Sequence, residues 1–328
     1  MDKDNRSSST PVYQHFVMQA SKLNPEYLSM IMPSRWFAGG KGLDDFRAAM
    51  LKDTHISILH DFLDASDCFD SSSVEIKGGV CYFLKDATHD GMCQVFTHKN
   101  GNNEIVKQNP RYLQETGSDV FIRYAEGVSI HHKVLAFNEE TMDKYVSSQK
   151  PFGLRTYVHG SAEPFDGCVT LYERGGIGYI AMNEIPKNID WVNQYKVYVS
   201  AAYNAGDSYP HQILGKPIFG NNNSCCTETY VVIGPWQSAN IAHNVELYIK
   251  TKFFRFLVML KKSSQHAAAS VYGFVPVQDF TKAWTDDALY KKYGLSDAEI
   301  SFIENTIKPM ESETGEMLKN PTFEPEVE

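Results

Sequence analysis

Residues 10–90 alternate between segments of helical periodicity and short apolar runs, and this alternation constrains the fold more than any other feature of the sequence. A helix is expected to begin at Thr10 and Pro11, because threonine caps helices and proline suits the first helical position. Its apolar residues recur at helical spacing and are expected to face the core: Val12, Phe16, Ala20 and Leu23. A second helix carries Leu43, Phe46, Met50 and Leu51.

Three apolar runs in the same region predict buried strands, at residues 28–32, 56–62 and 80–84. Helices that alternate with apolar strands predict an α/β layer architecture. Three strands are too few for a complete doubly wound sheet, so we expect residues 1–95 to form one half of an α/β domain.

The texture of the sequence changes near residue 95, where short β-like runs rich in Gly, Asn and Tyr begin. Two helical segments stand out among them, residues 238–261 with lysines opposite an apolar face and residues 296–307 with a capping-box start. We therefore expect an α+β domain over residues 96–310 and a disordered acidic tail over residues 311–328.

The net charge of −9 over 328 residues argues against a protein that coats nucleic acid by bulk electrostatics. The charge is unevenly spread, however. Residues 311–328 hold one lysine and six glutamates, a net charge of −5, whereas residues 195–272 hold seven Lys or Arg and three Asp or Glu, a net charge of +4. A basic stretch therefore lies inside an acidic total.

The longest apolar run, residues 253–260, is eight residues long and contains an arginine, whereas a membrane-spanning helix needs about 20 apolar residues. The first ten residues are polar and lack the apolar core of a signal peptide. The six cysteines show no CxxC spacing. These features predict reduced thiols in a cytoplasmic protein without a membrane span.

Short chemical motifs carry little weight in this sequence. The glycine-rich segment AGGKG at residues 38–42 lacks the Ser or Thr of a phosphate-binding loop and favours a tight turn into a helix. Asp70, Glu75 and Lys77 have the spacing of a metal-dependent nuclease, in which carboxylates hold a divalent cation. The adjacent Tyr82 and Phe83 point to opposite faces of their strand, so only one of them can face a pocket.

Longer blocks of the sequence are more specific than these motifs. Residues 10–51 (TPVYQHFVMQASKLNPEYLSMIMPSRWFAGGKGLDDFRAAML) and 74–86 (VEIKGGVCYFLKD) resemble the second half of the N6-adenine DNA methyltransferase domain of type II restriction–modification enzymes, in its gamma-class arrangement. The segments CTETYVVIG, YIKTKFFRFLVMLKK and FVPVQDFTKAWTDDALYKKYGLSDAEISFIE resemble the TaqI-like specificity domain of the same enzymes.

The resemblance implies the C-terminal half of a Rossmann-like methyltransferase sheet followed by a target-recognition domain. The N-P-P-Y catalytic motif and the glycine-rich S-adenosylmethionine motif of the family are absent from the sequence. The chain therefore resembles a truncated enzyme that binds double-stranded DNA and, alone, transfers no methyl group and holds no S-adenosylmethionine. Its expected partners are DNA and either the missing N-terminal half or a separate catalytic or restriction subunit.

The resemblance also suggests site residues. By position, Phe83, with Tyr82 as the alternative, would stack on the flipped adenine, and the pocket would be lined by Ser34, Arg35 and Trp36. Basic residues on or beside one helix would contact phosphates: Lys250, Lys252, Arg255, Lys261 and Lys262. Gln212 and Gln265 would pair with adenine, and Tyr203 and His211 flank a loop that would enter a groove.

Two other functions stay open at this point. The chain would be a non-catalytic specificity subunit if a separate polypeptide supplies catalysis. It would be a restriction nuclease if Asp70, Glu75 and Lys77 hold a metal ion.

Overall fold

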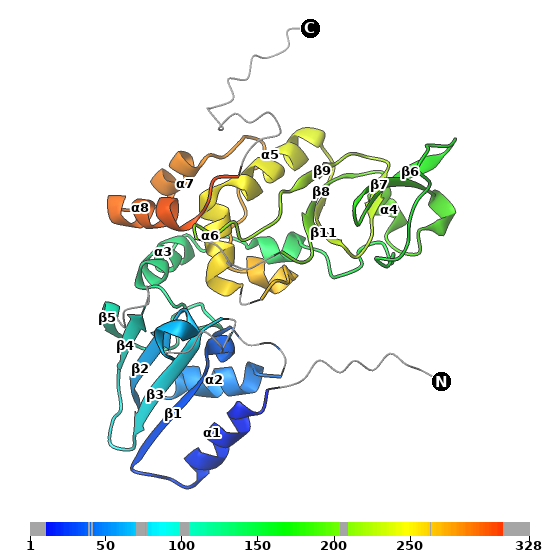
Figure 1. The fold of residues 1–328 in the computed structure, drawn as a ribbon. Coiled ribbons are helices and arrows are strands. Elements are labelled where there is room, and N and C mark those ends of the chain that lie inside the picture. Colours follow the sequence, from blue (N-terminus) through cyan, green and yellow to red (C-terminus); the bar gives the residue numbers. More distant parts are fainter. Residues whose placement is uncertain are drawn as a thin grey trace, which may run out of the picture. The chain divides into compact units, whose positions relative to one another are not determined.

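The computed structural model describes residues 11–38, 40, 42–69, 76, 78–98, 105–203, 209–262 and 264–310, with the backbone alone over 105–108 (Figure 1). The described chain divides into two compact units, Met1–His132 (unit 1) and Lys133–Glu328 (unit 2). The tail expected over residues 311–328 lies outside the described residues.

Unit 1 is built on a five-stranded sheet with the strand order β1-β3-β2-β4-β5. The strands are β1 (Tyr27–Pro33), β2 (Ile56–Phe62), β3 (Val80–Asp86), β4 (Cys93–His98) and β5 (Ile105–Arg111). β3 lies between β1 and β2 and is antiparallel to both, whereas β2 and β4 are parallel. Strands β1, β2 and β4 therefore run in the same direction, and their carboxyl ends lie at the same edge of the sheet.

The three strands predicted in unit 1 are confirmed, and the observed architecture is α/β. Its sheet is mixed, with both parallel and antiparallel strand pairs. β4 and β5 continue this sheet by pairing with β2 and with each other. Unit 1 therefore extends to His132, beyond the boundary expected near residue 95, because strand pairing places these later residues on the same sheet.

Helices α1 (Tyr13–Lys22) and α2 (Asp44–Lys52), with the 3₁₀ turn η1 (Ser34–Phe37), pack on one face of this sheet, as Figure 1 shows for α1 beside β1. The apolar residues predicted for α2 are all buried: Leu43, Phe46, Met50 and Leu51. A short 3₁₀ turn, η2 (Ala65–Asp67), follows β2.

The predictions for α1 need two corrections. The helix begins at Tyr13 with Val12 as its cap, and Thr10 lies outside the described residues. The predicted apolar face is also largely uncovered, because Phe16 is 65 % exposed and Leu23 is 82 % exposed, whereas Val17 is buried. Helical periodicity identified the apolar side chains of α1, but only some of these side chains contact the rest of the described chain.

Unit 2 contains two three-stranded sheets, with the orders β10-β6-β7 and β11-β8-β9. Their strands are β6 (Cys168–Glu173), β7 (Gly176–Ala181), β8 (Tyr195–Ser200), β9 (Ile218–Gly220), β10 (Ser224–Cys226) and β11 (Tyr230–Trp236). The helices and turns of this region are α3 (Ala125–Leu135, which spans the unit boundary), η3 (Met142–Tyr145), η4 (Met182–Glu184), α4 (Ile189–Val192), α5 (Ala239–Lys250), α6 (Lys252–Lys261), η5 (Ala269–Tyr272), α7 (Asp286–Lys292) and α8 (Asp297–Thr306).

The long helix predicted over residues 238–261 is two helices, because the backbone of Thr251 is extended between α5 and α6. The Thr251 hydroxyl donates to the carbonyl oxygen of Tyr248 at 2.7 Å and accepts from the amide of Phe254 at 3.2 Å. One side chain thus serves both helix ends at the break. The capping box predicted at Ser296 and Glu299 is confirmed at the start of α8.

None of the helices in the described part of the chain is long and apolar enough to cross a membrane. All six cysteines are free, and four of them are buried.

The sheet face of unit 1 that lies opposite α1 and α2 carries a ladder of rings. His60 stacks between Tyr82 of β3 and Phe96 of β4, with ring centroids 4.4 Å apart on each side. Nδ1 of His60 lies 2.8 Å from Nε2 of His98, so one ring donates a hydrogen bond to the other. Burial, together with the neighbouring His98, lowers the pKa of His60 to about 4.

This ladder predicts that unit 1 loses stability in mild acid. A histidine in the unfolded chain takes up a proton near its ordinary pKa of 6.5, whereas folded His60 stays neutral until about pH 4. Protonation therefore favours the unfolded chain as the pH falls from about 6.5 towards 4. We expect urea unfolding to show lower stability at pH 5 than at pH 7, and His60→Phe to reduce this difference.

His15→Gln is the matched control, because His15 is an exposed histidine in the same unit. Its pH dependence should follow that of the parent chain. An unchanged pH dependence in His60→Phe would contradict the assignment to His60.

Candidate functional site

The carboxyl edge of the unit 1 sheet is the candidate site. Ligands of sheets with parallel strands bind outside the carboxyl ends of those strands. Here β1 ends at Pro33 and is followed by Ser34, β2 ends with Asp61 and Phe62, and β4 ends at His98. The loop that precedes β3 lies at the same edge, because β3 is antiparallel to its neighbours.

A fully buried carboxylate organises this edge. Arg123 Nε donates to Oδ2 of Asp61 at 2.7 Å and Arg123 Nη2 donates to Oδ1 at 2.5 Å. The Ser34 hydroxyl donates to the same Oδ1 at 3.2 Å. Such a bidentate guanidinium–carboxylate pair is strong and geometrically specific. Asp61 is therefore occupied within the chain and is not a free acid or metal ligand.

The same arginine fixes the loop before β3. Arg123 Nη1 donates to the carbonyl oxygen of Gly78 at 2.9 Å, and Nη2 donates to that of Phe62 at 3.3 Å. The amide of Ser34 donates to the carbonyl oxygen of Gly79 at 3.0 Å. Both glycines have positive φ, +91° and +81°, which L side chains rarely adopt. The ends of β1 and β2 and the start of β3 are thus joined through one ion pair.

The structure separates the residues predicted to hold a flipped base. Trp36 is fully buried and donates its indole N–H to Sγ of Cys81 at 3.3 Å, and Ser34 is buried against Asp61. Arg35 is half-buried and keeps some accessible surface. Trp36 is therefore a core residue, and its predicted place in the lining of a base pocket is corrected.

The two adjacent aromatic residues lie on opposite faces of β3, as alternation predicted. Phe83 is 1 % exposed in the core beneath α1 and α2, so its ring has no free surface on which a base could stack. Tyr82 lies on the other face, half-buried in the ring ladder beside His60. The first choice for the stacking residue is corrected to core packing, and Tyr82 stays a prediction.

The basic helix predicted to contact phosphates is also corrected. Arg255 is fully buried, and burial lowers the pKa of its guanidinium to about 10. It donates to backbone carbonyl oxygens of Lys250, Thr251, Gln212 and Lys308. Arg255 therefore holds the α5–α6 break together and has no surface for DNA.

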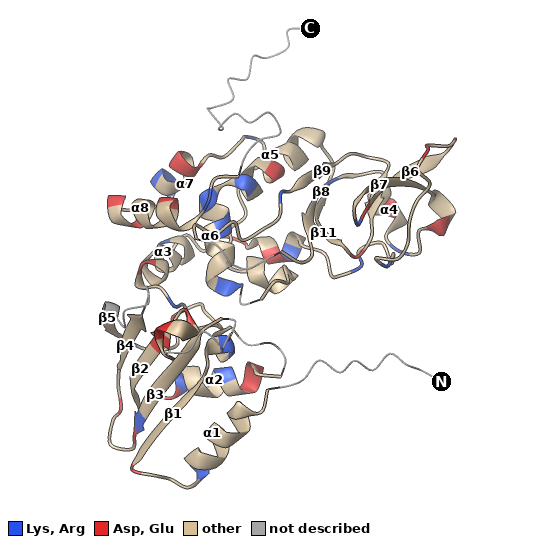
Figure 2. Cartoon of the chain, viewed as in Figure 1, with Lys and Arg blue, Asp and Glu red and all other residues tan. Residues whose placement is uncertain are grey.

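The lysines nearest the break are paired with acids. Lys250 Nζ lies 2.6 Å from Glu246, and Lys252 Nζ lies 2.5 Å from Glu304. Figure 2 shows basic and acidic segments interspersed among α5, α6, α7 and α8. The local excess of positive charge is thus partly neutralised within the fold by Glu246 from the same helix and Glu304 from α8.

The remaining predicted DNA contacts are mixed in their exposure. Lys262 is buried, donates to the carbonyl oxygen of Tyr203 at 2.9 Å, and has its pKa lowered to about 8 by burial. Lys261 is half-buried with its ammonium 5.0 Å from the ring centroid of Phe274. The side chain of Gln265 is exposed.

Three more of these residues line the loop that was expected to enter a groove. Tyr203, His211 and Gln212 are half-buried, and the Gln212 amide donates to the carbonyl oxygen of Leu214 at 3.2 Å. The loop tip between Tyr203 and Tyr209 lies outside the described residues. Among the predicted DNA contacts that the structure describes, Gln265 is therefore the exposed one, and Lys261 is half-buried like Tyr203, His211 and Gln212.

The predicted nuclease residues Asp70, Glu75 and Lys77 lie outside the described residues. Upstream, Asp64 caps η2 by accepting from the amide and hydroxyl of Ser66, and these hydrogen bonds lower the pKa of Asp64. Within the described ranges, no group of three or more His, Cys, Asp or Glu side chains is arranged to hold a metal ion.

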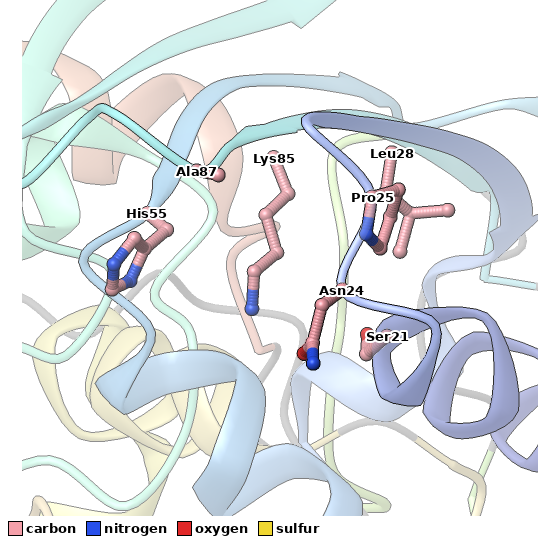
Figure 3. A pocket seen from close by; sticks show the side chains of 7 residues that line it. All are labelled: Ser21, Asn24, Pro25, Leu28, His55, Lys85 and Ala87. Carbon is pink, nitrogen blue, oxygen red and sulfur yellow. The ribbon is translucent and has the colours of Figure 1, made fainter.

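A pocket of about 210 Å³ lies at the opposite edge of the sheet (Figure 3). It is lined by Ser21, Asn24, Pro25, Leu28, His55, Lys85 and Ala87. Figure 3 shows Lys85 between His55 and Asn24, and its ammonium is held by Asp53 at 2.6 Å. This pocket is open and lies at the amino ends of β1 and β2, away from the edge where ligands are expected.

The described residues at the carboxyl edge do not fit S-adenosylmethionine. A ribose or an amino-acid group would need free polar side chains, yet Asp61 is held by Arg123, Ser34 by Asp61, and Trp36 by the core. We therefore derive no methyl-transfer step from the residues of this chain.

Arg123 is the residue that sequence reasoning missed. It lies 62 residues after Asp61, in a segment that was assigned to the second domain. One signal for the pair was present, because Asp61 stands inside an apolar strand sequence, ISILHDF, where a buried acid needs a cationic partner. The sequence alone did not identify which cation supplies it.

The two glycines of this loop allow a matched test. A Cβ at Gly78 would meet nothing within 4 Å, so Gly78→Ala carries only the strain of its positive φ, about 1–2 kcal/mol. A Cβ at Gly79 would collide with the carbonyl oxygen of Phe62 and lie 2.8 Å from that of Leu63. We expect Gly79→Ala to destabilise unit 1 clearly more than Gly78→Ala in urea unfolding. Equal effects would contradict this loop geometry.

The ion pair predicts an asymmetric double-mutant cycle. Arg123→Met leaves a buried carboxylate unpaired and should cost about 3–5 kcal/mol. Asp61→Asn combined with Arg123→Met removes both charges and should recover part of that loss. The measurement is the free energy of unfolding of the two single variants and the double variant. A cost below about 1 kcal/mol for Arg123→Met would refute the central role of this pair.

Comparisons with known proteins agree with the sequence resemblance in part. Residues 1–69 match the Eco57I restriction-modification methylase family model. The chain is 34% identical over 105 residues to an uncharacterized adenine-specific methylase of Mycoplasma pneumoniae. This match covers 31% of the chain and 24% of that protein, so it spans about a quarter of the curated relative.

Two solved structures show weaker similarity. The type IIG restriction endonuclease BpuSI is 8% identical with a TM-score of 0.33, covering 85% of this chain and 42% of that one. The type IIL restriction-modification enzyme MmeI, solved in complex with DNA, is 7% identical with a TM-score of 0.38, covering 90% and 49%. These low scores support no inference about the fold. The N-terminal part of this chain is thus similar in sequence to restriction–modification methylases.

Proposed function

We propose that this chain is part of an adenine-specific DNA methyltransferase of a restriction–modification system. The observation that carries the proposal is the methylase family match over residues 1–69. This segment contains α1, β1, α2 and β2, the elements that lead to the carboxyl edge of the sheet. The adenine-specific methylase of Mycoplasma pneumoniae supports the same reading.

The topology of unit 1 supports a finer assignment, the C-terminal half of a gamma-class, Rossmann-like methyltransferase sheet. β1 and β2 are parallel and connected through α2, as in a βαβ unit, and β3 is inserted between them in the antiparallel direction. The carboxyl ends of β1 and β2 then border the site of a bound base or cofactor.

The proposed division of labour follows from this arrangement. Unit 2, as a TaqI-like specificity domain, would contact double-stranded DNA, with Gln265 and Lys261 as the candidates that keep accessible surface. Unit 1 would help to hold the extruded adenine, which costs a few kcal/mol to flip. S-adenosylmethionine supplies the methyl group in such enzymes, and residues outside this chain would bind it.

The proposal predicts DNA binding without methyl transfer by this chain alone. Binding of a labelled mixed-sequence duplex should weaken steeply between about 50 and 200 mM salt, because contacts to phosphates release counterions. Incubation with labelled S-adenosylmethionine and the same DNA should give no incorporation. Clear incorporation would refute the proposal that catalysis needs residues outside this chain, and absence of DNA binding at low salt would refute the proposed role.

A pair of lysine variants sharpens this test. Lys261→Met should lower the slope of log affinity against log salt by about one if Lys261 contacts a phosphate. Lys252→Met should leave the slope unchanged, because Glu304 already holds that ammonium at 2.5 Å. A larger change in the slope for Lys252→Met than for Lys261→Met would contradict the assignment of Lys261 as a phosphate contact.

A further inference from the structure

The last described residues of the chain are anchored on the surface of unit 2. The amide of His211 donates to the carbonyl oxygen of Thr306 at 2.8 Å, and the amide of Lys308 donates to that of His211 at 2.9 Å. Arg255 Nη1 adds a hydrogen bond to the carbonyl oxygen of Lys308 at 2.8 Å. Residues 311–328 therefore follow directly on a point that is fixed beside His211.

The surface around this point lacks acidic side chains. None of the three segments that form it contains Asp or Glu: residues 196–203, 209–227 and 256–278. The segments meet in space, because the amide of Tyr203 donates to the carbonyl oxygen of Gln265 at 2.7 Å. A Cβ on Gly215 would lie 3.3 Å from the ring of Tyr203. We refer to the exposed surface of these three segments as the acid-free face.

The acid-free face carries positive charge. Lys216 and His266 are exposed on it, and Lys308 is exposed at its border, where the chain is anchored. The nearest acid before the anchored end is Glu304, and it is already paired with Lys252. An anionic partner would therefore meet cations here and no carboxylate from the three segments.

Residues 311–328 have the charge and the length to be this partner. They hold six glutamates and one lysine, a net charge of −5. A chain of this length spans at most about 60 Å when fully extended, which is enough to return across the face. A segment of the same chain also competes well with a separate ligand, because its tether raises its effective concentration.

We propose that residues 311–328 cover the acid-free face and compete there with DNA. Resting on the function proposed above, the same cations would contact either the glutamates of this segment or DNA phosphates. Contacts to phosphates carry no sequence information, whereas the recognised site adds contacts to bases. The segment would therefore weaken binding to arbitrary sequences more than binding to the recognised site, and so raise specificity.

The first test changes charge alone in the full chain. Replacing the six glutamates of residues 311–328 with glutamine should tighten binding of a mixed-sequence duplex about tenfold at about 50 mM salt. This gain should shrink at about 200 mM salt, because salt screens exposed charges. Glu324→Gln with Glu326→Gln should give part of the gain. The matched control, Glu163→Gln with Glu184→Gln, changes two exposed glutamates elsewhere in unit 2 and should give none.

The second test detects the contact itself. A carbodiimide joins a carboxylate to an amine without a spacer, so mass spectrometry should find bonds between Lys216 and glutamates of residues 311–328. Excess duplex should reduce these bonds. Lys216→Met should also reduce the gain that the six glutamine substitutions give. Lys282→Met, at an exposed lysine of unit 2 outside the acid-free face, should leave that gain unchanged.

The outcomes separate this proposal from the proposed function. Unchanged DNA affinity after the six substitutions, or no bond to Lys216, overturns the proposal. A gain that Lys216→Met and Lys282→Met reduce equally overturns the assigned face. If the bonds to Lys216 form but neither the parent chain nor the glutamine variant binds DNA, the contact with the acid-free face stands and the proposed function is overturned instead.

Discussion

An unpaired carboxylate in a protein interior costs several kcal/mol, and the geometry of unit 1 depends on how Asp61 avoids that cost. Its partner Arg123 comes from a segment beyond β5 and contacts the strand ends on both sides of the acid. The pair therefore fixes three features at once: the end of β2, the glycine loop before β3, and the return of the chain after the sheet.

The same pair shows why the fold was easier to predict than the site. The strands at 56–62 and 80–84 could be predicted from local apolar runs, because a buried strand is recognised from the apolar character of consecutive residues. The partner of Asp61 depends on a contact between residues 62 positions apart, which no local pattern encodes. Phe83 illustrates the limit at one position: alternation placed it opposite Tyr82, but not on the side that the helices cover.

The prediction that basic residues of one helix contact phosphates needed correction for a related reason. A count of charges over residues 195–272 is correct as arithmetic, yet it treats every lysine as solvated. Glu304 lies outside that window and forms an ion pair with Lys252. Arg255 donates its hydrogen bonds to backbone carbonyl oxygens at a helix break that no sequence pattern revealed. Electrostatic arguments from sequence therefore hold for whole surfaces and weaken for single residues once the acids brought in by tertiary contacts are counted.

In unit 1 the polar groups around Asp61 have partners, whereas apolar side chains of α1 and β1 are exposed. This difference separates the part of the unit that is fixed internally from the part that is open to contact. Ser34, Asp61 and Arg123 at the carboxyl edge are paired with one another, whereas Phe16, Leu23 and Ile31 on α1 and β1 are exposed in the described chain. An empty site for a small ligand would show the opposite arrangement. Its polar groups at the strand ends would be free, and its apolar surface would be covered. The structure thus separates an edge whose central ion pair is closed within the unit from a surface on α1 and β1 that keeps exposed apolar side chains.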